Sequence, residues 1–234
     1  MSDIVINQPT KLDFAKISKL IINDLNDSTP SSSINKKYTK EDIIRFMQNP
    51  RKNQKQLREV SRYLYEASPN YKRLILYFAC LPTFDYIVEP YGLNTEKINK
   101  KTFKTQYQKT LELLEIMNLP HEFLKVLKIA FKEDVFYGYE HMSDDSYFIQ
   151  PLDPDYCQIS SIEDGVYNFA FDFSYFNKYP KKLKQYPEEF QQKYKKYEKD
   201  KKNYRWQELD SNNTICIKVN EELDYPLPPF NAVF

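Results

Sequence analysis

The sequence predicts an α+β fold in which N-terminal helices precede a small antiparallel β-meander and one further helix. Up to about residue 131, apolar residues recur every three or four positions, which is helical spacing. From about residue 135 they fall in short aromatic and β-branched runs separated by turn residues, which is typical of strands. The 20 Tyr and 16 Phe among 234 residues carry far more apolar surface than a disordered chain does.

The chain divides by composition into an N-terminal arm and a larger domain. Residues 13–25 have helical spacing, but the stretch that follows is rich in Ser and Asn and has no periodicity. We therefore expect residues 1–37 to form an arm and flexible linker, either mobile or packed on a neighbouring copy. Residues 38–234 then form one α+β domain.

Start and stop signals define the helices of this domain. Thr39 with Asp42 is a variant of the capping box, and Ser68-Pro69 is a cap followed by Pro at the first helical position. Together with the apolar spacing, these signals predict helices from Thr39 to Asn49, over 54–67, 69–80 and 100–117, and from Asn118 to about residue 131.

The strands are predicted from alternation and turn residues. Phe84, Tyr86 and Val88 alternate within 84–90, which predicts a strand there. The meander begins at about 135, and Asp164-Gly165 signals a hairpin turn within it. Residues 187–203 then predict a helix and 214–220 one more strand.

Several function classes are excluded by composition. The three glycines lie far apart, so no phosphate-binding glycine loop exists. The three cysteines are too dispersed for a zinc ribbon or a disulfide framework, and free thiols fit a reducing, intracellular site of folding. The N-terminus lacks the pattern of a signal peptide, and no apolar run is long enough to span a membrane.

Charge is distributed unevenly although the net charge is only +1. Residues 133–172 contain ten acidic side chains and no Lys or Arg, whereas 181–205 contain ten basic and four acidic ones. These stretches are either ordinary solvated surface or complementary faces through which neighbouring copies meet. The candidate basic face comprises Lys193, Lys195, Lys196, Lys199, Lys202 and Arg205. The candidate acidic face comprises Asp144, Asp145, Asp153, Asp155, Glu163 and Asp164.

Signals for catalysis are weak. Asp153-Pro154-Asp155 offers two carboxylates to a hard cation, but the proline favours a turn that Asp153 caps. His121 and His141 lack metal-ligand spacing, and no cysteine has a base nearby in sequence. The Tyr and Lys residues of 193–206 favour an amphipathic helix with lysines over its apolar face; base stacking and phosphate contact are the weaker alternative. We expect no cofactor, no metal and no enzymatic activity; a hydrolase using Asp144, Asp145, Asp153 or Asp155 is the enzymatic alternative.

Two long segments resemble a known family. LREVSRYLYEASPNYKRLILYFACLPTFDYIVEP (57–90) and KEDVFYGYEHMSDDSYFIQPLDPDYCQISSIEDGVYNFAFDFSYF (132–176) resemble the N-terminal, wing-side part of portal proteins of tailed bacteriophages that infect Firmicutes. The resemblance covers roughly residues 38–234. The family continues past the segment corresponding to Pro228-Pro229-Phe230 into stem and clip regions, so we expect a chain truncated before them. We expect the apolar tail over 225–234 to be exposed and prone to association.

The resemblance implies a virion structural protein without enzymatic activity. Portals form rings, typically of 12 copies, at one capsid vertex, through which double-stranded DNA is packaged and ejected. It further implies contacts with capsid, terminase and head–tail connector proteins, assembly in the bacterial cytoplasm and no membrane partner. The alternative from a different class is a stand-alone adaptor derived from the portal wing, which binds another protein and has no DNA channel.

Overall fold

The computed structural model describes residues 38–82, 84–90, 99–143 and 146–234. The helix predicted over 13–25, and Asp144 and Asp145, lie outside the described residues. The chain forms two compact units, 1–49 and 50–234. In the first, α2 (Lys40–Gln48) begins after Thr39, whose side chain accepts a hydrogen bond from the Asp42 N–H while the Asp42 carboxylate accepts one from the Thr39 N–H. The predicted capping box is confirmed.

The second unit opens with helices that pack on one another. They are α3 (Gln54–Ala67), α4 (Pro69–Cys80) and α6 (Leu119–Glu133). The Ser68 side chain caps α4 as predicted, because it accepts a hydrogen bond from the Tyr71 N–H. Helix α5 (Lys100–Met117) leads into α6 through Asn118, which adopts a left-handed conformation at φ 43°. The predicted helices of this unit are therefore confirmed.

The strand predicted over 84–90 is wrong. These residues belong to no strand, Phe84 has a left-handed φ of 53°, and Ile87 is 86% exposed. Alternation alone does not make a strand, since a strand needs a neighbouring edge to receive its backbone hydrogen bonds. Here the Val88 carbonyl instead accepts a hydrogen bond from the Tyr107 hydroxyl, at 3.3 Å.

The predicted meander is divided between two antiparallel sheets of three strands each. One sheet has the order β2 (Tyr147–Pro151), β1 (Val135–Met142), β6 (Thr214–Lys218), and the other has β3 (Cys157–Glu163), β4 (Val166–Asp172), β5 (Trp206–Glu208). The division occurs after β2, where Asp153-Pro154 starts the 3-10 helix η1 (Pro154–Tyr156) and interrupts pairing. The hairpin is as predicted: Asp164 and Gly165, at φ 48° and 80°, join β3 to β4.

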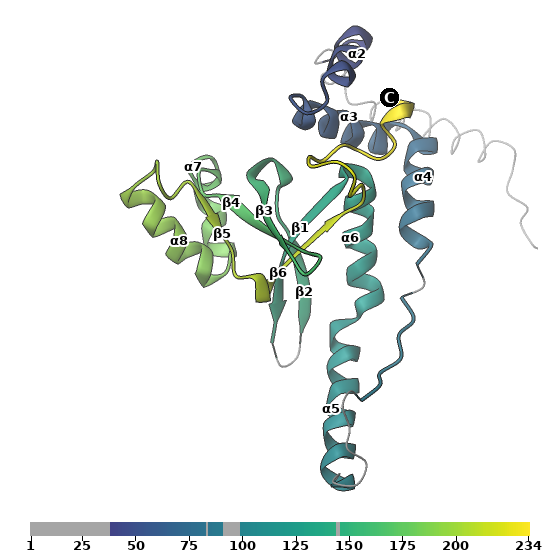
Figure 1. The fold of residues 1–234 in the computed structure, drawn as a ribbon, viewed down its shortest axis with the longest axis vertical. Coiled ribbons are helices and arrows are strands. Elements are labelled where there is room, and N and C mark those ends of the chain that lie inside the picture. The colour runs from purple at the N-terminus through teal and green to yellow at the C-terminus, as the bar shows by residue number, and fades with distance from the viewer. Residues whose placement is uncertain (1–37, 83, 91–98, 144–145) are drawn as a thin grey trace, which may run out of the picture. The chain divides into compact units, whose positions relative to one another are not determined.

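The described residues form two hydrophobic cores, and strand β1 contributes side chains to each, because successive side chains of a strand point to opposite faces. Val135, Tyr137 and Tyr139 face a core shared with the second sheet and α8, whereas Phe136 faces the core formed with α6. The order of layers is thus α6, the β1 sheet, and then the β4 sheet with α7 and α8 beyond it (Figure 1). The α+β fold predicted from the sequence is confirmed.

The segment after β4 returns to helix as predicted, but the helix is shorter than expected and an unpredicted strand, β5, follows it. It contains α7 (Tyr175–Lys178), η2 (Pro180–Gln185) and α8 (Glu188–Lys199). Helix α8 ends at Lys199 rather than at 203, because the Asp200 carboxylate accepts hydrogen bonds from the N–H groups of Lys202 and Asn203 and forms a turn. Strand β5 escaped prediction because three residues are too few to show a period.

The C-terminal segment is packed rather than exposed, contrary to the expected sticky tail. The 3-10 helix η3 (Ser211–Asn213) leads into β6, and the segment after β6 contains η4 (Asn231–Val233) near its end. Pro228 is fully buried, and the Phe230 ring lies 5.2 Å from that of Phe78 on α4. Helices α4 and α6 therefore cover the Phe230 ring, whereas Val233 stays 59% exposed.

Candidate functional site

The candidate basic face lies on α8 and the turn that follows it. Phe190 and Tyr197 of α8 are buried in the core, where Phe190 packs on Phe171 and Phe176. Because these aromatic residues fix one side of the helix toward the core, the lysines occupy the other side. Lys195, Lys196, Lys199 and Lys202 are exposed, and the structure gives their ammonium groups no hydrogen bond or ion pair with any described residue.

Two members of the predicted basic face already have partners in the chain. Lys193 donates a hydrogen bond to the Glu208 carbonyl at 2.7 Å and lies 3.5 Å from the Glu189 carboxylate. Arg205 donates two hydrogen bonds to Asp172, at 3.0 and 2.8 Å. These two residues position α8 and β5 on the sheet, so the four unpaired lysines carry the available charge.

The predicted acidic residues are distributed over two places. Asp153 caps its own turn, since its carboxylate accepts a hydrogen bond from the Asp155 N–H at 3.0 Å, as the turn interpretation predicts. Asp155 is paired with Arg58 at 2.5 Å and with Lys55 at 3.3 Å. Glu163 and Asp164, at the tip of the β3–β4 hairpin, are exposed, and the structure assigns their carboxylates no partner among the described residues. The hairpin tip is therefore the acidic surface that remains available.

The basic face and the acidic tip lie at opposite ends of β4. The strand starts at Val166, beside the hairpin turn, and ends at Asp172, after which the Phe173 ring packs 5.9 Å from that of Phe190 on α8. Seven strand residues extend about 20 Å. That separation exceeds the Debye length of about 10 Å at 0.1 M salt, so the two surfaces do not neutralise each other within one chain.

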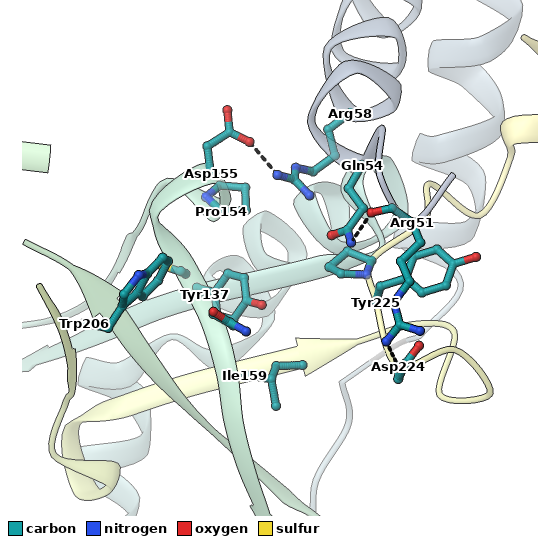
Figure 2. Close-up of a pocket in the computed structure, with 13 residues that line it drawn as sticks. Arg51, Gln54, Arg58, Tyr137, Pro154, Asp155, Ile159, Trp206, Asp224 and Tyr225 are labelled. Atoms are coloured by element: carbon teal, nitrogen blue, oxygen red, sulfur yellow. Dashed lines mark hydrogen bonds and ion pairs between the residues drawn. The ribbon is translucent and has the colours of Figure 1, made fainter. Parts of the chain in front are cut away.

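A pocket opens beside the N-terminal end of α3 (Figure 2). Arg51, Gln54 and Arg58 line it from the helix side, and Tyr137 and Ile159 from the two sheets. Arg58 is 5% exposed, although it is charged. The sequence does not reveal this site, because Arg58 and Asp155 are 97 residues apart. The one available signal is a charged residue between the buried positions Leu57 and Val60.

Several titratable groups around α3 form ion pairs with one another. Burial alone would raise the pKa of Asp155, but the hydrogen bond and charge of Arg58, with the charges of Lys55 and Arg62, hold it below the ordinary 3.8. The Arg62 guanidinium donates two hydrogen bonds to the Glu133 carboxylate, at 3.0 and 2.6 Å. Burial opposes the charge of Arg62, but the Glu133 carboxylate raises the pKa of Arg62 above its ordinary value. These pairs attach α3 to η1 before β3 and to the C-terminal end of α6.

A buried ion pair that the sequence did not reveal joins β6 to the end of α6. Asp134 accepts hydrogen bonds from the Lys218 ammonium at 2.8 Å and from the N–H groups of Asn220 and Leu227 at 2.8 and 2.9 Å. Both side chains are almost fully buried. Burial raises the pKa of Asp134 although Lys218 opposes the shift. All of these hydrogen-bond partners of Asp134 belong to the same chain, which indicates that the buried pair stabilises the fold.

The described residues offer little for nucleophilic or metal chemistry. Burial raises the pKa of the Cys157 thiol well above its ordinary value and that of Cys216 to about 12, so both stay protonated near neutral pH. His141 stacks on Phe148 and shares a hydrogen bond with Gln150, and His121 lies exposed at the start of α6. No cluster of three or more His, Cys, Asp or Glu side chains suited to a metal occurs among the described residues.

None of the described helices is long and apolar enough to cross a bilayer.

Comparisons with known proteins give no relatives. No protein-family model, no curated protein and no solved structure matches the chain.

Proposed function

We propose that this chain is a structural, non-enzymatic subunit, or the N-terminal part of one, of a bacteriophage portal ring at the capsid vertex. The support from sequence is the resemblance of residues 57–90 and 132–176 to portal proteins. In the virion such a ring would contact capsid, terminase and connector proteins and pass double-stranded DNA. The virion location and a ring of about 12 copies are part of this proposal.

The observation that carries the proposal is the pair of charged surfaces at the two ends of β4. A ring of identical copies needs head-to-tail contacts, in which one surface of a copy meets a different surface of the next. The four unpaired lysines of the basic face and the acidic tip at Glu163 and Asp164 have opposite charge, and both are exposed. Their separation prevents pairing within one chain and leaves each free for a neighbour.

The test is the mass of the purified chain, measured by native mass spectrometry and light scattering over a range of salt. We expect large assemblies at low salt that dissociate as salt is raised, because exposed charge pairs are screened. The variant Lys195→Glu/Lys196→Glu/Lys199→Glu should assemble less. A matched control, Lys101→Glu/Lys104→Glu/Lys109→Glu, reverses three exposed lysines on α5 and should assemble normally.

A charge swap makes the test specific for the two surfaces. Adding Glu163→Lys and Asp164→Asn to the α8 variant should restore assembly, because the asparagine keeps the left-handed turn conformation while the tip becomes basic. A chain that stays monomeric at every salt concentration, or an α8 variant that assembles like the wild type, would contradict the ring contact and favour a stand-alone adaptor.

A further inference from the structure

Exposed apolar side chains adjoin both charged surfaces. Ile162 and Val166 stand on either side of the acidic tip, and each is more than half exposed; we call them the tip pair. Tyr204 and Trp206 flank Arg205 at the end of the basic face and are 45% and 40% exposed; we call them the aromatic pair. Apolar groups rimmed by charged ones are typical of protein–protein contacts, whereas isolated exposed apolar residues are ordinary surface.

The strand register keeps the tip pair at the surface. Ile162 lies opposite Tyr167 across the hairpin, and Val166 lies opposite Glu163. Because neighbouring residues of a strand point to opposite faces, the tip presents one apolar side chain on each face. The buried residues of the hairpin, such as Phe169, lie farther along the strands. The tip therefore extends beyond the core, and its apolar side chains are available to a partner.

The aromatic pair is held on a fixed stretch of backbone. Trp206 pairs with Asp172 across β4 and β5, and Arg205 donates two hydrogen bonds to the Asp172 carboxylate. The Tyr204 N–H donates to the Asp200 carbonyl at 3.1 Å. Rigid aromatic side chains on a fixed backbone lose little conformational entropy when a partner covers them, so they bind at low entropic cost.

Charge alone gives a weak contact between the acidic tip and the basic face. Exposed ion pairs contribute little affinity, although they direct the approach and the register of two surfaces. Affinity comes chiefly from apolar and aromatic side chains buried at the centre of an interface, where Tyr and Trp are enriched. A stable contact between these surfaces therefore needs an apolar centre, and the tip pair and the aromatic pair are the exposed apolar groups beside them.

We propose that the β3–β4 hairpin of one copy docks on the turn between α8 and β5 of a second copy. The tip pair packs against the aromatic pair, and the acidic tip meets the lysines of the basic face around that apolar centre. The hairpin turn and α8 lie at opposite ends of β4 (Figure 1), so the contact is head-to-tail. This inference rests on the proposed ring and adds the residues that determine the affinity of its contact.

The wild-type chain reports the contact through Trp206, the one tryptophan of the sequence. As the chain assembles at low salt, the emission of Trp206 should shift to shorter wavelength and acrylamide should quench it less than in the monomer. The reason is that the indole moves from water into an apolar contact. Assembly that leaves the emission and quenching of the monomer unchanged would overturn the inference, since Trp206 would then lie outside the contact.

The variant Ile162→Ser/Val166→Ser tests the other side of the contact. We expect the apparent dissociation constant for assembly to rise about tenfold or more, as on truncation of residues at the centre of an interface. Its dependence on salt should stay that of the wild type, because no charge is lost, whereas the α8 charge variant should change that dependence. The matched control Leu81→Ser/Ile87→Ser removes two exposed aliphatic side chains outside both surfaces and should assemble normally.

The outcomes separate this inference from the proposed ring. A chain that stays monomeric at every salt concentration contradicts both. Salt-dependent assembly that Ile162→Ser/Val166→Ser weakens no more than the control does, in a variant whose circular dichroism matches the wild type, overturns the apolar contact alone. The Trp206 measurement on the wild type decides the question where that variant does not fold.

Discussion

At the residue scale, the buried pair of Asp134 and Lys218 has the largest expected effect on stability. The two side chains are 0% and 2% exposed, and no water reaches them to replace a lost partner. Lys218 also donates to the Asn220 carbonyl, and Asn220 donates to Asp134, so the two residues and the turn after β6 form one hydrogen-bonded unit. Removing one charge leaves the other buried and uncompensated.

We therefore expect Lys218→Met to lower the free energy of unfolding by about 3–5 kcal/mol. Adding Asp134→Asn should recover part of that loss, because no charge remains buried, although the single amide oxygen keeps only one of the two hydrogen bonds from the N–H groups of Asn220 and Leu227. Urea unfolding of the wild type, both single variants and the double variant gives the coupling free energy. Additive losses would contradict direct coupling of the two side chains.

At the element scale, local signals were predictable from the sequence and long-range pairing was not. The caps at Thr39 and Ser68 and the hairpin at Asp164-Gly165 were predicted because each rests on residues adjacent in the chain. The strand expected over 84–90 failed because pairing requires an edge that the sequence does not display. The pocket was missed for the same reason, since Arg58 meets Asp155 only after the helices pack on the sheets.

Substitutions at two glycines separate the contribution of local backbone conformation to stability from the contribution of long-range packing. Gly165 needs its positive φ of 80°, but a Cβ there would meet nothing within 4 Å, so Gly165→Ala should cost about 1 kcal/mol of backbone strain. A Cβ on Gly138 would lie 2.5 Å from the Phe136 ring, so Gly138→Ala should cost about 1–3 kcal/mol through overpacking.

Asparagine distinguishes the two causes, because it tolerates the left-handed conformation. In urea unfolding, Gly165→Asn should be more stable than Gly165→Ala, whereas Gly138→Asn should be less stable than Gly138→Ala. The same order of alanine and asparagine at both positions would show that backbone strain does not govern the hairpin.

At the scale of the whole second unit, ion pairs join α3 to the end of α6 and to the 3-10 turn that precedes β3. Arg58 and Lys55 hold Asp155 in η1, just before β3, and Arg62 holds Glu133 at the C-terminal end of α6. The partners of each pair are separated by at least 71 residues. Protonation of the Asp155 carboxylate should therefore weaken the packing of α3 on the segment before β3 as well as the pair itself.

Acid titration should expose the contribution of Asp155. Its pKa in the folded chain lies below 3.8, so the ionised carboxylate stabilises the fold above about pH 3.8, and that stability is lost as the pH falls through the lower, folded-state value. Asp155→Asn should be less stable than the wild type at pH 7, and its free energy of unfolding should decline less as the pH falls below 3.8. Denaturant unfolding between pH 2 and pH 7 measures both, with Glu163→Gln, at an exposed carboxylate, as the control expected to follow the wild-type curve. An Asp155→Asn curve parallel to that of the wild type would show that the link between α3 and the segment before β3 does not depend on this charge.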